Sequence, residues 1–308
     1  MAENIIETYD LTFYYGKKKV VDGLNLRVQS GSVFALLGRN GSGKTTTIRM
    51  LLGLLYPTRG FSKILGHDSE DIPPGVLSSI GYMNEEHKVY RWMKVREIEK
   101  FQSQFYPLWK RELFYTVIEH FRLDTELKVK HLSRGQRAGL CLALTMAQNP
   151  KLLILDDPVL GLDAVVRRTL MEAMVYLTRD SDKTILFSSH ILSEVERVAD
   201  RIAIIDNGVL RANCSVDTFR ERVNKVSLYF ESPPLKIPDI KNLLNYTILK
   251  DRINFTFVNY DDEIENVLKN LNPQNIEPVP LSLEDAFINY VEDKGKNSFL
   301  INRLGEIS

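Results

Sequence analysis

Two stretches of the sequence combine residue types that handle phosphate and metal ions. The first, GRNGSGKT, runs from Gly38 to Thr45 and joins three glycines to a lysine and a threonine. Glycines let the backbone turn its N–H groups onto phosphates, the lysine reaches the outer phosphates, and the hydroxyl can bind Mg²⁺. We therefore expect a nucleoside triphosphate to be bound by Gly38, Asn40, Gly41, Ser42, Gly43, Lys44, Thr45 and Thr46.

The second stretch, KLLILDDPVLGLD, runs from Lys151 to Asp163 and places two adjacent carboxylates after four apolar residues. Beside a phosphate-binding loop, an acid at the end of a neighbouring hydrophobic strand holds the Mg²⁺ shell. Leu152 to Leu155 predict that strand. We therefore assign Asp156, together with Thr45, to the metal.

The elements that must position these residues can be predicted around them. The apolar run 32–38 is followed by the loop and then by helical spacing over 44–55, which predicts strand, glycine-rich loop and helix. From 137 to 206, helices alternate with wholly apolar strands, and this indicates a parallel sheet covered on both faces. Between 84 and 130 the pattern is helical and aromatic. We expect its rings mostly to fill a core: Trp92, Phe101, Phe105, Trp109, Phe114 and Phe121.

The character of the sequence changes around Arg220. The segments that follow predict the order strand, helix (238–245), strand, strand, helix, strand, helix. This is the order of a ferredoxin-like α+β unit with a terminal helix. We therefore predict a first domain over 1–220, with a helical subdomain at about 84–135, and a small accessory domain with a tail over 221–308. The tail from Lys294 is expected to be frayed or to dock elsewhere.

Composition narrows the class of protein further. Forty basic residues balance forty acidic ones in a chain of 308 residues, so no overall field favours nucleic acid. The two cysteines, Cys141 and Cys214, have no metal-binding or disulfide spacing and suit a reducing cytoplasm. The start of the chain is not expected to be a signal peptide, and its apolar runs are too short to span a bilayer.

A third motif names a family. LSRGQ, residues 132–136, lies upstream of an apolar helix and of the two carboxylates, and it resembles the LSGGQ signature of ABC ATPases. The other landmarks of that family follow in order, with Asp163 of LGLD in the D-loop and His190 of SSH as the switch histidine. The resemblance covers roughly the first 220 residues. It implies an α/β P-loop NTPase fold of the ABC ATPase type, with a mixed sheet core and a helical signature subdomain, that binds ATP and Mg²⁺.

The resemblance also implies roles for further residues. Family members pair head to tail, so that Ser133, Gly135 and Gln136 of one subunit close over the ATP on the other. Tyr15, with Tyr14 as the alternative, matches the aromatic that stacks on adenine. Ser133 is equally compatible with an ordinary helix cap, which accounts for local shape alone.

Three positions depart from the family pattern. Arg134 replaces the first signature glycine, while Gly135 keeps the turn. Glu85 aligns with the Q-loop glutamine and is assigned to catalysis and to Mg²⁺, with Glu86 or Asn84 as alternatives. Asp157 takes the place of the catalytic glutamate and retracts the carboxylate by up to about 1.5 Å, one C–C bond length. We therefore expect normal ATP binding and dimerisation with slow hydrolysis, or work in a heterodimer beside a better site; a homodimer and a heterodimer both stay open.

The family comparison also suggests a branch and a partner. PLSLEDAFINYV and VYRWMKVREIEKF resemble segments of ABC-2-type exporter ATPases. We expect a separate transmembrane permease to contact Tyr90, Trp92 and Trp109, and the chain to lie peripherally on the cytoplasmic face of the cell membrane. The alternatives are a regulatory or degenerate ATP-binding subunit of a heterodimer, or a soluble ABC protein without a transport role.

Overall fold

The computed structural model describes residues 3–179, 183–234 and 237–292, and the predicted tail from Lys294 lies outside them. The chain divides into two compact units. One consists of Met1–Asp200 with Ile205–Leu210, and the other of Arg201–Ile204 with Arg211–Ser308. The two units are described in turn.

A parallel sheet forms the centre of the first unit. Its strands follow the order β4 (Val33–Leu37), β9 (Thr184–Ser189), β8 (Leu152–Leu155) and β7 (Ile80–Met83). The strands are almost continuously apolar and buried, as expected for a sheet covered on both faces. Because the carboxyl ends of parallel strands meet at one edge, the loops after all four strands converge there.

A second, antiparallel sheet is built from the N-terminal strands. It contains β1 (Asn4–Tyr15), β2 (Lys18–Leu24), β3 (Arg27–Gln29), β5 (Arg59–Ile64) and β6 (His67–Asp68). β1 pairs with β2, β3 and β5, and β6 pairs with β5. β5 and β6, with the sequences RGFSKI and HD, have no clear apolar alternation.

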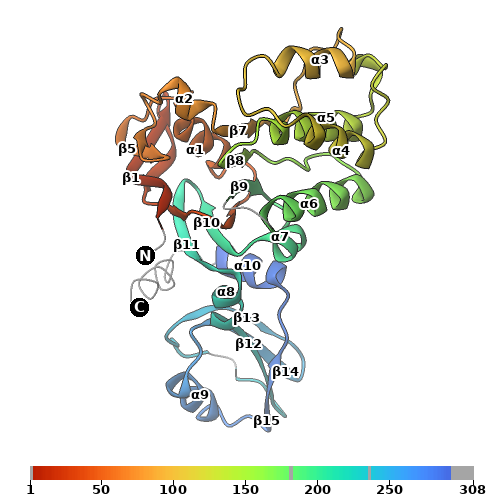
Figure 1. The fold of residues 1–308 in the computed structure, drawn as a ribbon. Coiled ribbons are helices and arrows are strands. Elements are labelled where there is room, and N and C mark those ends of the chain that lie inside the picture. The colour runs from red at the N-terminus through yellow and green to blue at the C-terminus, as the bar shows by residue number, and fades with distance from the viewer. Residues whose placement is uncertain (1–2, 180–182, 235–236, 293–308) are drawn as a thin grey trace. The chain divides into compact units, whose positions relative to one another are not determined.

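Helices cover these sheets and form a separate group around the signature. They are α1 (Lys44–Leu51), α2 (Pro74–Leu77), α3 (Val95–Gln102), α4 (Arg111–His120), the 3₁₀ turn η1 (Val129–His131), α5 (Arg134–Ala147), α6 (Ala164–Arg179) and α7 (Leu192–Val198). Figure 1 shows α3, α4 and α5 side by side in its yellow to green segment. Gly139 allows α4 and α5 to approach closely, because a Cβ there would lie 2.4 Å from the Phe121 ring.

The prediction that the aromatic residues of this group mostly fill a core is wrong for half of them. Phe114 is fully buried, and Trp109 and Phe121 are partly buried. The exposed rings are those of Trp92, Phe101 and Phe105. For Phe105 the reason is that α3 ends at Gln102, so the helical spacing that would place Phe105 on the buried face stops there.

The second unit contains a four-stranded antiparallel sheet. Its order is β13 (Leu243–Ile248), β14 (Arg252–Val258), β12 (Val223–Tyr229) and β15 (Asn275–Val279), with α9 (Asp262–Lys269) and α10 (Leu283–Glu292) completing the set. Numbered 1 to 4 in chain order and taken from β15 to β13, the strands follow the order 4-1-3-2 of a ferredoxin-like sheet. Its core gathers Leu228, Phe255, Phe257 and Leu268, each fully buried.

One predicted helix of this unit is wrong. Residues 238–245 form no helix: the segment is irregular up to Asn242 and then enters β13. Asn242, inside the segment, has φ of 63°, a left-handed backbone angle that interrupts a right-handed helix. The segment still buries Ile240 against the sheet, so its apolar spacing reflects packing of an irregular connection.

The predicted boundary at residue 220 falls inside the second unit. The hairpin of β10 (Arg201–Asp206) and β11 (Val209–Ser215) is divided between the units, and helix α8 (Val216–Arg222) follows it. Phe219 of α8 packs edge-on against Tyr290, and the Tyr290 hydroxyl donates to the Arg211 carbonyl at 2.7 Å. Residues 211–222 therefore belong with the segments that follow them.

Candidate active site

The glycine-rich loop connects β4 to α1 as predicted. Gly41 and Gly43 have φ of 80° and 108°, a region that other residues rarely adopt. Gly38 leaves no room for a side chain, because a Cβ would lie 2.3 Å from the Ile205 carbonyl oxygen. Ser42 is buried, while Asn40 is exposed at the rim. The first-turn N–H groups of α1, including those of Thr45 and Thr46, have no partner inside the helix and are suited to an anion.

Lys44 lies at the centre of this loop. Its Nζ donates to the carbonyl oxygens of Gly38 at 2.7 Å and Arg39 at 3.2 Å, and the residue is 7% exposed. Burial lowers its pKa, and the charges of Asp157, Asp156 and Glu85 oppose that shift. The ammonium group is therefore surrounded by the acids that the sequence assigns to the reaction.

Asp156 is joined to the loop by hydroxyl groups. Its Oδ1 accepts hydrogen bonds from Thr45 Oγ1 at 3.1 Å and from Ser188 Oγ at 2.8 Å. Burial raises the pKa of this 1%-exposed carboxyl, and the two hydroxyl bonds oppose the shift. Thr45 and Asp156 thus present two hard oxygen ligands side by side, a donor set that suits Mg²⁺.

Asp157 and His190 form the second half of the site. His190 Nδ1 lies 2.9 Å from Asp157 Oδ2, and the Asp157 N–H donates to Ser188 Oγ at 2.8 Å. A carboxylate can only accept, so His190 donates from Nδ1 and its Nε2 is left for other contacts. Asp157 Oδ1 is buried, and no described residue donates a hydrogen bond to it.

Glu85 follows β7 at the same edge of the sheet. It is half-buried, and its charge acts on Lys44 and on Tyr82. Glu86 is exposed and paired with Lys88, and the side chain of Asn84 accepts from the Lys88 N–H at 3.4 Å. Of the three alternatives, Glu85 is the one whose charge bears on the phosphate loop.

The signature residues begin helix α5. Ser133 Oγ accepts from the Gln136 N–H at 3.1 Å, and Gln136 Oε1 accepts from the Ser133 N–H at 3.0 Å. This capping box confirms the local reading of Ser133 as a helix cap. Gly135 lies against Val166, and the Arg134 guanidinium covers Gly161, where a Cβ would lie 2.2 Å from an Arg134 nitrogen.

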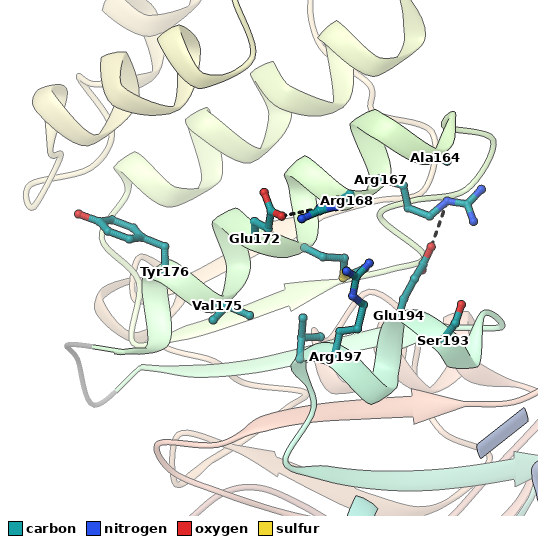
Figure 2. A pocket seen from close by; sticks show the side chains of 11 residues that line it. Ala164, Arg167, Arg168, Glu172, Val175, Tyr176, Ser193, Glu194 and Arg197 are labelled. Atoms are coloured by element: carbon teal, nitrogen blue, oxygen red, sulfur yellow. Dashed lines mark hydrogen bonds and ion pairs between the residues drawn. The ribbon is translucent and has the colours of Figure 1, made fainter. Parts of the chain in front are cut away.

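Asp163 begins helix α6, and its Oδ1 accepts from the N–H groups of Val165 and Val166 at 3.0 Å each. On the same helix, Arg167 donates to the Leu162 carbonyl at 3.2 Å, and its Nε lies 3.0 Å from Glu194 on α7. Figure 2 shows this ion pair at one end of the pocket between α6 and α7. Arg167 therefore ties the D-loop to the helix that follows His190.

The structure brings Lys44, Thr45, Asp156, Asp157 and His190 into one connected site. Ser133, Gly135, Gln136 and Asp163 form a second, largely exposed group at the starts of α5 and α6. Tyr15 ends β1 with 49% of its surface exposed and its ring 4.8 Å from that of Phe13.

Sequence reasoning missed four residues with structural links to this site: His87, Arg167, Ser188 and Glu194. Ser188 was quoted in SSH, and its place two residues before His190 on a buried strand was the available signal. Arg167 and Glu194 lie on helices, four residues after Asp163 and His190 respectively.

The fold and this connected site define the class of protein. A glycine-rich loop between a buried strand and a helix, with its threonine bonded to an acid at the end of a neighbouring parallel strand, is the arrangement of P-loop nucleoside triphosphatases.

Comparisons with known proteins identify the family within this class. Residues 21–160 match the model described as ABC transporter. The chain is 38% identical over 223 residues to the bacitracin transport ATP-binding protein BcrA of Bacillus licheniformis, which covers 72% of this chain and 73% of the relative. It is also 27% identical over 291 residues to the ABC transporter ATP-binding protein YtrB of Bacillus subtilis (strain 168), covering 92% and 97%.

A solved ATP-binding subunit of an ABC transporter has a similar fold. It superposes with a TM-score of 0.64 at 29% identity, over 70% of this chain and 92% of that one. This chain therefore belongs to the ABC transporter ATP-binding proteins, and it is an ATPase subunit with the predicted P-loop fold. Among the described residues, no helix has both the length and the apolar character that a bilayer span requires.

Proposed function

We propose that this chain hydrolyses ATP to power a separate transmembrane exporter. The observation that carries the proposal is the continuous set of contacts Thr45–Asp156–Ser188–Asp157–His190, which joins the phosphate loop to two groups able to move a proton. Lys44 and the α1 N-terminus would bind the phosphates, and Tyr15 would stack on the adenine.

The residues present fit Mg²⁺. Thr45 Oγ1 donates a hydrogen bond to Asp156 Oδ1 at 3.1 Å. The two oxygens are therefore close enough for one cation to bind both in place of this hydrogen bond. Glu85 is a further carboxylate whose charge reaches this loop. When bound, the ion would neutralise charge on the transferred phosphoryl group. Asp156 would hold it from the buried side.

Asp157 would act as the general base. Its Oδ2 is held by His190, and no described residue donates a hydrogen bond to its buried Oδ1, so Oδ1 keeps the capacity to accept a proton from a water bound beside it. The side chain is one methylene shorter than glutamate, and the proton acceptor must come within about 2.6–3.2 Å of the water. We therefore propose that turnover is slow while ATP binding is normal.

The exposed residues at the starts of α5 and α6 support a head-to-tail dimer. Ser133 and Asp163 are exposed, and helix N-termini favour anions, so this group would meet the phosphates bound by another subunit. A homodimer is the simpler assembly. A heterodimer, in which this chain is the regulatory or weaker site, is supported by Asp157 and Glu85, two departures from the family pattern.

An exposed aromatic surface supports a membrane partner. Trp92 and Phe105 are 70% and 62% exposed, and Tyr90 and Phe101 link them through ring contacts of 5.2–6.3 Å. Trp109 instead donates to Glu99 at 3.1 Å and is partly buried. We propose that Tyr90 and Trp92 contact a permease segment and that the chain lies on the inner face of the membrane.

Phosphate release by the purified chain tests the proposal. We expect Asp157→Glu to raise kcat, Asp157→Asn to lower it about 10²–10⁴-fold, and both to leave ATP affinity unchanged. Lys44→Ala should abolish ATP binding. A wild-type rate typical of transport ATPases with no gain in Asp157→Glu would contradict the slow site.

Cosedimentation with native membranes tests the proposed membrane partner. Trp92→Ala should reduce the share of the chain that sediments with the membranes, whereas Tyr176→Ala, a matched exposed ring on α6, should not.

A further inference from the structure

His87 lies in the loop after β7 and is turned into the protein. The residue is 3% exposed, although Glu85 and Glu86 directly before it form a turn in which Glu86 is exposed. Its Nε2 lies 3.0 Å from the Pro158 carbonyl oxygen. Because a carbonyl can only accept, Nε2 carries the hydrogen and donates it. The contact joins two segments that lie 71 residues apart.

Pro158 belongs to the turn that carries Asp157. Asp157 has φ of 44°, an uncommon value for a residue with a side chain. Within the turn, the carbonyl oxygens of Asp157 and Val159 accept from the N–H groups of Leu160 and Leu162, each at 3.1 Å. The Pro158 carbonyl between them accepts from His87. One bond from another loop therefore fixes the Pro158–Val159 peptide, one residue beyond Asp157.

A second contact holds the far end of the same turn. The Arg134 guanidinium covers Gly161, which has φ of 68°. The segment 157–161 is thus contacted near its start by His87 and near its end by Arg134.

We propose that His87 is a positioning residue for Asp157: its bond to Pro158 holds the strained turn in the conformation that presents the Asp157 carboxylate. Pairing between Asp157 and His190 orients the carboxylate plane, and His87 fixes the backbone that carries it. The proposal rests on the proposed function, because it requires Asp157 to accept the proton. It makes hydrolysis depend on the conformation of the loop after β7.

Single-turnover hydrolysis of Mg·ATP by the full-length chain tests this role. We expect His87→Ala to lower kcat about tenfold, roughly the effect of losing one buried hydrogen bond, with the affinity for ATP unchanged. His87→Gln should keep kcat within about twofold of wild type, because its amide N–H can take the place of Nε2. His67→Ala, an exposed histidine on β6, is the matched control.

A double substitution shows whether His87 acts through Asp157. In the Asp157→Asn background, His87→Ala should change the residual rate less than about twofold, because the group that it positions is already lost. Independent tenfold losses, a His87→Gln rate no better than that of His87→Ala, or a parallel loss of ATP affinity would overturn the positioning role. An unchanged rate in Asp157→Asn alone would instead overturn the proposed base. Thermal unfolding of each variant identifies losses caused by misfolding.

Discussion

His190 Nδ1 donates to Asp157 Oδ2 at 2.9 Å, so His190 and the acid beside Asp156 form a pair within a single chain. His190 retains about a third of its side-chain exposure, whereas Asp157 is buried. The pair therefore has one protected member and one that faces solvent. The first prediction follows from this asymmetry.

Replacing His190 with alanine should lower kcat about 10²-fold or more, because Asp157 Oδ2 loses the donor that orients it and the proton-moving group at the solvent side is removed. ATP affinity should change less than threefold, since Lys44 and the phosphate loop are untouched. Equilibrium binding of a fluorescent ATP analogue and single-turnover hydrolysis measure the two effects. A fall in affinity that matches the fall in rate would assign His190 to binding.

The Arg167–Glu194 pair gives a prediction for pH. Burial raises the pKa of Glu194 from 4.5 to about 7; Arg167 opposes the shift, and the charge of Asp157 adds to it. Between pH 4.5 and about 7, Glu194 is protonated in the folded chain but ionised in the unfolded chain. Protonation of Glu194 therefore makes its full contribution to the free energy of unfolding below pH 4.5, and this contribution is lost as pH rises through 7.

Glu194→Gln is neutral at every pH and removes this dependence. The variant should match wild type near pH 5 and become more stable than wild type by about 1–3 kcal/mol near pH 8, less the lost attraction to Arg167. Thermal unfolding at both values measures the difference. Glu172→Gln, on the exposed pair with Arg168, serves as the control. A constant difference between wild type and Glu194→Gln across this range would be inconsistent with a raised pKa.

Gly139 should not tolerate even alanine. Its Cβ would lie 2.4 Å from Cγ of Phe121, so α4 and α5 would have to separate. We expect Gly139→Ala to lower the free energy of unfolding by about 1–3 kcal/mol, the usual effect of overpacking. Gly75→Ala on α2 is the control, because no described neighbour lies within 4 Å of its Cβ position. Adding Phe121→Leu should recover part of the loss if crowding is its cause.

The two cysteines should be unreactive in the folded chain. Burial raises the pKa of Cys141 to about 12 and that of Cys214 to about 11, so almost no thiolate is present near pH 8. We expect less than one thiol in ten to react with a maleimide in an hour under native conditions, and both to react in denaturant. Rapid labelling of either site without denaturant would show that its region opens.

Much of the candidate site at the carboxyl ends of the parallel strands could be predicted from the sequence, because its residues follow strands with strong apolar patterns. Asp156 and the glycine-rich loop were placed from a buried run ending in acids and from glycine spacing. The structure joins them through Thr45, at 3.1 Å. For Ser188 the sequence offers only its place in SSH on a buried strand, because its bonds to Asp156 and Asp157 depend on β8 and β9 being neighbours. His87 could not be found this way, because its role depends on which loops meet.

The errors in the second unit and the helical group have a common physical origin. Residues 238–245 and the rings after Ile98 both have apolar spacing compatible with a helix. Spacing indicates which side chains are apolar on one face, but left-handed residues such as Asn242 and helix ends such as Gln102 decide whether a helix buries them. Ile240 reaches the core from an irregular segment, and Phe105 does not reach a core at all.

The contact between Arg134 and Gly161 makes two positions of the sequence constrain each other. Gly161 has φ of 68°, which favours glycine, and a Cβ there would lie 2.2 Å from an Arg134 nitrogen. The guanidinium therefore fills the space that a side chain at 161 would need. A larger residue at 161 would have to displace the guanidinium, so the arginine in the signature and the glycine in the turn depend on each other.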